Sequence, residues 1–274
     1  MGETLKRAIF GSIFVALVVA ACIYSSFSLT MLMLVVSTIG LYEWCRMQGA
    51  DSMPILVFSL ILNYMILGWN NPVLIILGFG SSAVAIGQMA VVLFVFAIWV
   101  LVKYKTEAID KLAVAINGLV LISLPCLLLL RMQPFKAEEY QYVYPLAVFI
   151  LIWISDTMAY VAGRLFGKHK LFEILSPKKT VEGWIGGAFF TAIAGAFLYY
   201  LWEIGPLWQG FVLAFVIAIF GVFGDLFISS IKRKTGLKDT GNIIPGHGGI
   251  LDRFDAFFFA VPAAYAWYAF TLVI

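Results

Sequence analysis

Charged residues are scarce in this sequence. Asp, Glu, Lys and Arg make up 12% of its 274 residues, hydrophobic residues make up 63%, and mean hydropathy is +1.00. A soluble domain carries about 25% charged residues, so this composition excludes an ordinary soluble domain and predicts an integral membrane protein. The net charge of only +3 gives no reason to expect a nucleic-acid partner.

Cysteine pairs and the common nucleotide motifs are also missing. Cys22, Cys45 and Cys126 lie in apolar runs without C-x-x-C spacing, which argues against a disulfide framework or a zinc site. The sequence has no G-x-x-x-x-G-K-[ST], no kinase motif set and no H-E-x-x-H. A nucleotide that binds this chain must therefore bind in a membrane-embedded site of another kind.

Long apolar runs, by contrast, are abundant. One membrane crossing needs about 20 apolar residues in an α-helix. The clear runs of this kind are Ala8–Tyr24, Leu29–Trp44, Leu112–Leu130, Tyr144–Leu165, Trp184–Trp202, Leu207–Ile231 and Ala256–Ile274. Residues 54–102 are broken by Asn70-Asn71-Pro72 and most simply add two crossings, Pro54–Trp69 and Ala83–Val102. The predicted fold class is all-α: a polytopic integral membrane protein with about nine transmembrane helices.

Lys and Arg are unevenly divided between the alternating loops. With the N-terminus in the cytoplasm, sixteen of the eighteen fall on the cytoplasmic side, and only Arg131 and Lys136 fall outside. Because basic loops stay in the cytoplasm, we expect a cytoplasmic N-terminus and an outside C-terminus. We expect the first run to be a retained helix and not a cleaved signal peptide.

The stretches between the apolar runs are each too short to form a core of their own. We therefore predict a single membrane-embedded domain over residues 1–274. Within it, residues 1–140 are expected to be mostly scaffold, and residues 141–274 are expected to carry the catalytic helices and cytoplasmic loops.

Two carboxylates lie where membrane helices rarely carry them. Asp156 and Asp225 interrupt apolar runs, and a charge at membrane depth costs at least about 2.5–3.5 kcal/mol. They precede Arg164 and Lys232 by eight and seven residues, so each lies roughly 10–12 Å from the cytoplasmic end of its helix. The two groups could share a site reached from the cytoplasm. A structural alternative for Asp156 is an ion pair with Arg164 or with a lysine of another helix.

The loop that follows, residues 232–255, is rich in charge and glycine. Its basic residues Lys232, Arg233, Lys234 and Lys238 suit a polyanion, and Gly246-His247-Gly248-Gly249 would let backbone N–H groups approach phosphate oxygens. Asp252 and Asp255 begin the last run, where the helix dipole favours carboxylates, so Asp252 could simply cap that helix. Carboxylates arriving from two sides also suit Mg²⁺, which would supply the countercharge that the buried aspartates need.

A second polar loop, residues 166–183, gives a similar indication. Ser176-Pro177-Lys178-Lys179 has the pattern of an N-cap, a proline at the first helical position and two lysines in the first turn. A helix N-terminus that carries lysines is an anion site. The alternative for Lys168 and Lys170 is that they only reflect the excess of basic residues in cytoplasmic loops.

The loop at residues 229–255 also has a recognisable spacing. Its fixed positions are Ser229, Ile231-Lys232-Arg233, Lys238-Asp239, Gly241, Ile244-Pro245, His247-Gly248-Gly249-Ile250 and Asp252-Arg253-Phe254-Asp255. This pattern closely resembles the signature of the phosphatidate cytidylyltransferase family, also called CDP-diacylglycerol synthases. Further blocks similar to that family are Ser155-Asp156, Ala159-Tyr160, Gly163-Arg164, Gly167-Lys168, Ser176-Pro177-Lys178-Lys179-Thr180 and Glu182-Gly183.

The resemblance implies transfer of a cytidylyl group from CTP to phosphatidate, which yields CDP-diacylglycerol and pyrophosphate for phospholipid biosynthesis. It further implies a Mg²⁺-dependent site, leaving open a second metal or a monovalent cation, and a homodimer embedded in the lipid bilayer. The expected location is a bacterial inner (plasma) membrane, with the active site open to the cytoplasmic side.

Specific residues can be assigned to this chemistry as hypotheses. The metal ligands would be Asp225 and Asp252, with Asp156 as a further ligand or a supporting group. The predicted catalytic residues are Asp225, Asp252, Lys238, Asp239, His247 and Arg253. The predicted substrate-binding residues are Ser176, Lys178, Lys179, Thr180, Arg233, Gly248 and Gly249. His247 would contact phosphate or organise the loop and is not expected to be an obligatory base, because phosphatidate is already ionised at neutral pH.

Three other classes of protein remain as alternatives. An ion-coupled transporter also has carboxylates within broken helices, but it gives no reason for the polar loop at residues 232–255. The second class is a neighbouring lipid enzyme: a CTP-dependent polyprenol kinase would share the nucleotide, whereas a CDP-alcohol phosphatidyltransferase would need a D-G-x-x-A-R motif that is absent here. A non-catalytic scaffold would leave the buried carboxylates unexplained.

Overall fold

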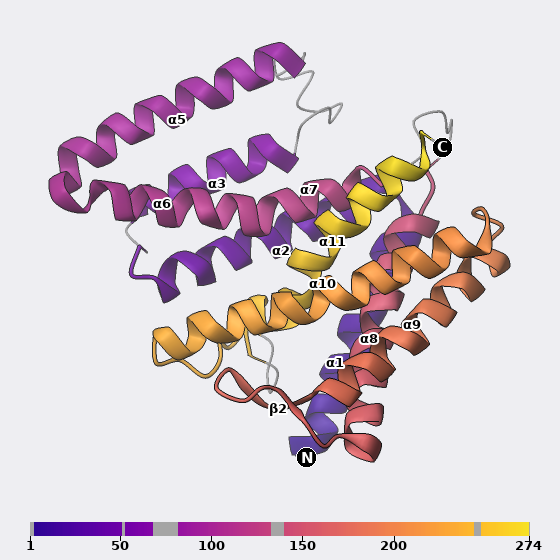
Figure 1. The fold of residues 1–274 in the computed structure, drawn as a ribbon. Coiled ribbons are helices and arrows are strands. Elements are labelled where there is room, and N and C mark those ends of the chain that lie inside the picture. Colours follow the sequence, from indigo (N-terminus) through magenta and orange to yellow (C-terminus); the bar gives the residue numbers. More distant parts are fainter. Residues whose placement is uncertain (1–2, 51–52, 68–81, 133–139, 244–247, 274) are drawn as a thin grey trace. The chain divides into compact units, whose positions relative to one another are not determined.

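Helices make up most of the structure, a computed structural model that describes residues 3–50, 53–67, 82–132, 140–243 and 248–273 (Figure 1). The helices in the first half are α1 Glu3–Tyr24, α2 Ser26–Met47, α3 Met53–Leu67, α5 Ser82–Tyr104, α6 Ala108–Gly118 and α7 Leu124–Leu130. Those in the second half are α8 Val143–Phe166, α9 Val181–Leu201, α10 Leu207–Lys234 and α11 Leu251–Thr271. A 3₁₀ turn at Lys105–Glu107 precedes α6, and a π-helical turn at Leu119–Ser123 joins α6 to α7.

The mostly helical character that the apolar runs predicted is confirmed. Among the described residues, the segments long and apolar enough to cross a membrane are Ser26–Met47, Ala108–Leu130, Val143–Phe166, Val181–Leu201 and Leu207–Lys234. The full set of about nine crossings and the orientation of the termini stay predictions. The predicted break at Asn70-Asn71-Pro72 lies outside the described residues.

One predicted helix start is wrong. Residues Ser176–Thr180 form a strand, β2, which pairs antiparallel with β1, Lys170–Phe172, in the register Lys170 to Thr180 and Phe172 to Ser176. Helix α9 begins after this strand, and its N-cap is Thr180, whose Oγ1 accepts a hydrogen bond from the Gly183 N–H at 3.2 Å. Proline is tolerated at an edge strand as well as at the first helical position, and threonine caps helices as serine does.

The chain divides into two compact units, residues 30–127 and residues 1–29 with 128–274. In the unit formed by residues 30–127, the Trp44 Nε1–H donates to the carbonyl of Val114 at 2.9 Å. The indole lies against Gly118, where a Cβ would come within 2.8 Å of the ring. The rings of Phe58 and Phe96 stack with centroids 3.4 Å apart. The predicted division near residue 140, within a single domain, stays a prediction.

The other unit contains α1, α8, α9, α10, α11 and the hairpin β1–β2. Its aromatic core includes Phe149 of α8 and Phe254 and Phe257 of α11, all nearly inaccessible to solvent, with Phe14 of α1 placed edge-on to Phe254 at 5.6 Å. Burial of such large aromatic side chains contributes strongly to packing. This core fixes the start of α11, which carries the charged end of the polar loop.

Small residues let α8 and α9 approach closely. A Cβ built on Gly183 would lie 2.7 Å from the carbonyl oxygen of Ala159, and one built on Gly187 would lie 2.8 Å from the Ala159 Cβ. Side chains at these positions would collide with the neighbouring backbone, so glycine is needed for the observed spacing, as in other close contacts between membrane helices. The result is a rigid pair of helices whose connecting segment is the β1–β2 hairpin.

Candidate active site

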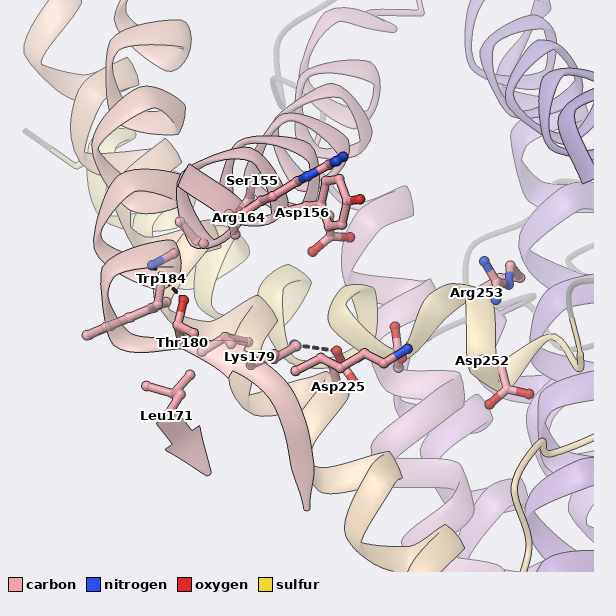
Figure 2. A pocket seen from close by; sticks show the side chains of 18 of the residues that line it. Ser155, Asp156, Arg164, Leu171, Lys179, Thr180, Trp184, Asp225, Asp252 and Arg253 are labelled. Atoms are coloured by element: carbon pink, nitrogen blue, oxygen red, sulfur yellow. Dashed lines mark hydrogen bonds and ion pairs between the residues drawn. The ribbon is translucent and has the colours of Figure 1, made fainter. Parts of the chain in front are cut away.

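A cavity of about 580 Å³ lies in the unit that contains the hairpin, among α8, β1–β2, the start of α9, α10 and the start of α11 (Figure 2). Its acidic lining residues are Asp156, Asp225, Asp239, Asp252 and Asp255. Its basic lining residues are Arg164, Lys178, Lys179, Lys232 and Arg253. Opposite charges are thus gathered at the ends of otherwise apolar helices, and such an arrangement suits highly charged ligands.

Asp225 and Lys179 form an ion pair within this cavity (Figure 2). Each side chain is 29% exposed, and the Ser229 Oγ–H also donates to Asp225 Oδ1 at 3.1 Å. The lysine arrives from β2, and the carboxylate and the serine lie one turn apart on α10. The countercharge that the sequence demanded for Asp225 is therefore supplied in this structure by Lys179.

Asp252 has a different set of partners. Its Oδ1 accepts from Lys232 Nζ at 2.7 Å, and its Oδ2 accepts from the Thr240 N–H at 2.8 Å and from the Gly249 N–H at 3.0 Å. Its side chain is only 6% exposed. Asp252 lies in the first turn of α11, whose N-cap residue is Ile250, and besides its contact at the start of this helix the carboxylate ties the polar loop to α10.

Gly248 is part of the same arrangement. Its φ of +82° falls in the region that side-chain-bearing residues rarely adopt. A Cβ at this position would come within 2.5 Å of Asp252 Oδ2. The glycine therefore allows the loop backbone to lie directly against the carboxylate, which explains its place in the sequence pattern without requiring contact with a substrate.

Asp255 is a lining residue that the sequence reasoning did not include among the candidates. It follows Asp252 by three residues, so both project from neighbouring positions on α11, and its Oδ1 accepts from the Ala256 N–H at 2.8 Å. Asp255 lies close enough to Asp225 and Asp156 for the three carboxylates to repel one another. The spacing D-R-F-D, already part of the sequence pattern, was the signal that could have identified it.

The other predicted site residues are distributed unequally. Lys178, Lys179, Thr180, Asp239 and Arg253 line the cavity, as do the three predicted metal ligands. Of the remaining described candidates, those outside the lining are Ser176, Arg233, Lys238, Gly248 and Gly249. His247 lies outside the described residues. The cavity adds Arg164 and Lys232, which the sequence suggested only as pairing partners or as part of a basic run.

Comparison with known proteins gives these observations a context. Residues 5–271 match the cytidylyltransferase family. The chain belongs to that family. This confirms the resemblance that the polar loop indicated.

Several bacterial relatives are similar over part of the chain. A phosphatidate cytidylyltransferase of Staphylococcus haemolyticus is 46% identical over 120 residues, which is 43% of this chain and 46% of that protein. Enzymes of the same name from Staphylococcus saprophyticus and Staphylococcus aureus are 44% and 47% identical over 128 residues, each covering 46% of this chain and 48% of the relative. These matches therefore span about half the length of the curated relatives.

In this member of the cytidylyltransferase family, the carboxylate of Glu182 holds together the two ends of the β1–β2 hairpin. Glu182, in the first turn of α9, accepts hydrogen bonds from the backbone N–H groups of Lys168 at 3.0 Å and His169 at 3.2 Å. It also contacts His169 Nδ1 at 2.5 Å, while the His169 carbonyl accepts from the Val181 N–H at 2.9 Å. These contacts join the segment after α8 to the start of α9, so the base of the hairpin is closed. Lys179 lies two residues before Val181, next to this closed base.

Replacing Glu182 with Ala is expected to lower kcat/KM for the cytidylyl transfer proposed below by about 10-fold to 10²-fold, because a shift of the hairpin would misplace Lys179. Glu182→Gln, which keeps an acceptor for one backbone N–H, should lose less. The matched control is Glu173→Ala, at the exposed turn of the same hairpin. Equal activities for the Glu182→Ala and Glu173→Ala proteins, each measured in purified form, would show that the closed base does not position Lys179.

Proposed function

We propose that this protein transfers a cytidylyl group from CTP to phosphatidate, forming CDP-diacylglycerol and pyrophosphate for phospholipid biosynthesis. The observation that carries the proposal is the single cavity in which the ends of α8, α10 and α11 meet a lysine-bearing hairpin. Membership of the cytidylyltransferase family and the names of the staphylococcal relatives support the same reaction.

The proposed reaction requires basic side chains in the cavity, and the cavity lining supplies them. A phosphate oxygen of phosphatidate forms a new bond to the α-phosphorus of CTP, and the bond from that phosphorus to the oxygen bridging to the β-phosphate breaks. Because both reactants are anions, the protein must mainly neutralise charge and align the two groups. In this proposal Lys178, Lys179 and Arg253 hold phosphate oxygens, with Lys238 and Arg233 approaching from the adjoining loop.

The carboxylates fit a divalent cation by their chemistry. Mg²⁺ takes hard oxygen ligands and usually binds one or two protein carboxylates together with substrate phosphates and water. In the described part of the chain, no three His, Cys, Asp or Glu side chains are arranged as a complete metal site, and a site completed by phosphates needs fewer. We assign Asp225 and Asp252 as its protein ligands and Asp156 as a supporting group. When bound, the cation would neutralise charge on the triphosphate.

The membrane arrangement is part of the proposal. The apolar segments, together with the sixteen-to-two division of basic residues, support about nine crossings with a cytoplasmic N-terminus and an outside C-terminus. The cavity then opens to the cytoplasmic side of a bacterial inner membrane, where CTP arrives from water and phosphatidate arrives from the bilayer. We further propose that the protein acts as a homodimer.

The proposal is tested with the detergent-purified protein, labelled CTP and phosphatidate. We expect a cytidine-bearing lipid to form with Mg²⁺ and its formation to stop when EDTA removes the cation. A phosphorylated alcohol in place of that lipid would identify a CTP-dependent kinase. Uptake of a solute by proteoliposomes without CTP consumption would identify a transporter, and absence of any labelled lipid would overturn the proposed reaction.

A further inference from the structure

The tip of the β1–β2 hairpin carries apolar side chains that face neither the core nor the cavity. Ile174, in the turn between the strands, is 91% exposed, and Phe172, at the end of β1, is 45% exposed. Together these two side chains are called the hairpin tip below. We infer that the hairpin tip inserts into the interfacial layer of the bilayer, in the leaflet toward which the cavity opens, and anchors the cavity beside the lipid headgroups.

The position of the hairpin in the chain limits where its tip can lie. Residues 167–180 connect α8 to α9, and both helices are long and apolar enough to cross the membrane. Ile174 follows Phe166 by eight residues and precedes Val181 by seven, so an extended arm could carry it at most roughly 20–25 Å from the helix ends. The interfacial layer of the bilayer is therefore within reach of the hairpin tip.

The side-chain pattern of β1 directs the hairpin tip away from the cavity. Leu171 lines the cavity, as Figure 2 shows, whereas Phe172 is outside the cavity lining and is 45% exposed, beyond a register shift in the hairpin. Phe172 therefore faces outward. The last turn of α8 also carries exposed apolar side chains, since Leu165 and Phe166 are 67% and 66% exposed. Exposed apolar residues therefore lie on both sides of the exposed polar segment 167–170.

The charges around the hairpin tip favour a lipid surface over another protein as its partner. Exposed Lys168, Lys170 and Lys178 flank it, and Glu173 is the acidic residue of the turn. Basic side chains beside exposed aliphatic and aromatic ones are typical of elements that lie in the membrane interface, where they meet anionic headgroups. The Lys170 Nζ also donates to the Pro177 carbonyl at 2.6 Å, which fastens one strand to the other.

Anchoring the hairpin tip in the bilayer would also affect the position of Lys179 in the cavity. The hairpin base is closed by Glu182, and Lys179 on β2 contacts Asp225 inside the cavity. Anchoring the hairpin tip therefore sets the depth of Lys179 relative to the headgroups. This functional part of the inference rests on the proposed function, because it concerns access of membrane-bound phosphatidate, whereas the insertion of the tip does not.

Insertion is measured directly with a nitroxide label on an Ile174→Cys protein in liposomes that contain anionic lipid. Labels at Lys234→Cys, an exposed residue at the end of α10, and at Phe197→Cys, 59% exposed on α9, provide the water and lipid references. The native residues Cys22, Cys45 and Cys126 are buried. We expect the Ile174 label to lose accessibility to a water-soluble nickel complex relative to Lys234 and to gain accessibility to oxygen. A label as accessible to nickel as that at Lys234 would overturn the insertion.

The functional part is tested with Ile174→Asp and the milder Ile174→Ser, using vesicle-borne phosphatidate and a short-chain, water-soluble phosphatidate. The apparent KM for vesicle-borne phosphatidate should rise about tenfold, while the KM for CTP and the turnover of the short-chain lipid stay unchanged. Ile109→Asp, at a residue 79% exposed near the start of α6, is the control. Unchanged kinetics in vesicles would overturn this part. Failure of the wild-type protein with both lipids would refute the reaction instead, and the label would still report the depth of the tip.

Discussion

An Asp225→Asn protein is expected to insert and fold but to lose turnover by about 10²–10³-fold, the loss typical when one charged or polar group that stabilises a transition state is removed. The substitution keeps the shape of the side chain and an oxygen that the Ser229 hydroxyl can still reach. It removes the negative charge that faces Lys179. It also removes an oxygen donor of the kind that Mg²⁺ prefers.

The measurement is the rate of cytidine-lipid formation by purified protein over a range of Mg²⁺ concentrations. The control is Asp110→Asn, which removes an exposed carboxylate on α6 and should leave the rate unchanged. Loss of turnover at every Mg²⁺ concentration, or recovery only at much higher concentrations, agrees with the assigned role. Retention of most activity at ordinary Mg²⁺ concentrations would remove Asp225 from the metal site.

The second large effect is expected at Gly224, one residue before Asp225. A Cβ at this position would collide with the backbone carbonyl oxygen of Asp255 and would approach Ala256 Cα to 3.2 Å. Because a backbone carbonyl on a packed helix cannot move aside as a flexible side chain can, Gly224→Ala should push α10 and α11 apart. Overpacking of this kind costs about 1–3 kcal/mol. It should also move Asp225 away from the carboxylates at the start of α11, which include the assigned metal ligand Asp252, and so abolish most of the activity.

Gly221 is a matched control on the same helix, one turn away. A Cβ built there would meet only the Ala256 Cβ, at an ordinary contact distance of 3.6 Å. Gly221→Ala should therefore be tolerated, and it should stabilise the helix by roughly 0.5–1 kcal/mol because alanine loses less backbone freedom on folding. Thermal unfolding in detergent and the activity assay together compare the two variants. Similar behaviour of both proteins would contradict the tight contact between α10 and α11.

The helices were predictable because each membrane-spanning helix requires a long continuous run of apolar residues. An apolar run must be long enough to span hydrocarbon, so Val143–Phe166 and Leu207–Lys234 could be located within a few residues. The β1–β2 hairpin was not predictable in the same way. Its residues Ser176-Pro177 fit an edge strand and a helix start equally well, and only pairing with Lys170–Phe172 decides between them.

The candidate site was predictable at positions where a charged residue interrupts an apolar run. Asp156 and Asp225 are charged groups in apolar runs, and this conflict alone marked them. Their partners could not be foreseen, because contacts such as Lys179 with Asp225 join segments far apart in the chain. Asp255 was overlooked for a related reason: beside Asp252 at a helix start it looked ordinary until the packing of α11 on α10 placed it in the cavity.

The glycine contacts between α8 and α9 have a consequence for how a lipid can enter. The backbones already touch where Gly183 and Gly187 meet Ala159, so no hydrocarbon tail can slip through this seam. The two helices therefore form a closed wall on one side of the cavity. In the proposed reaction, diacyl substrate and product would pass around that wall, and gating motions would come from the elements that are not bound into it.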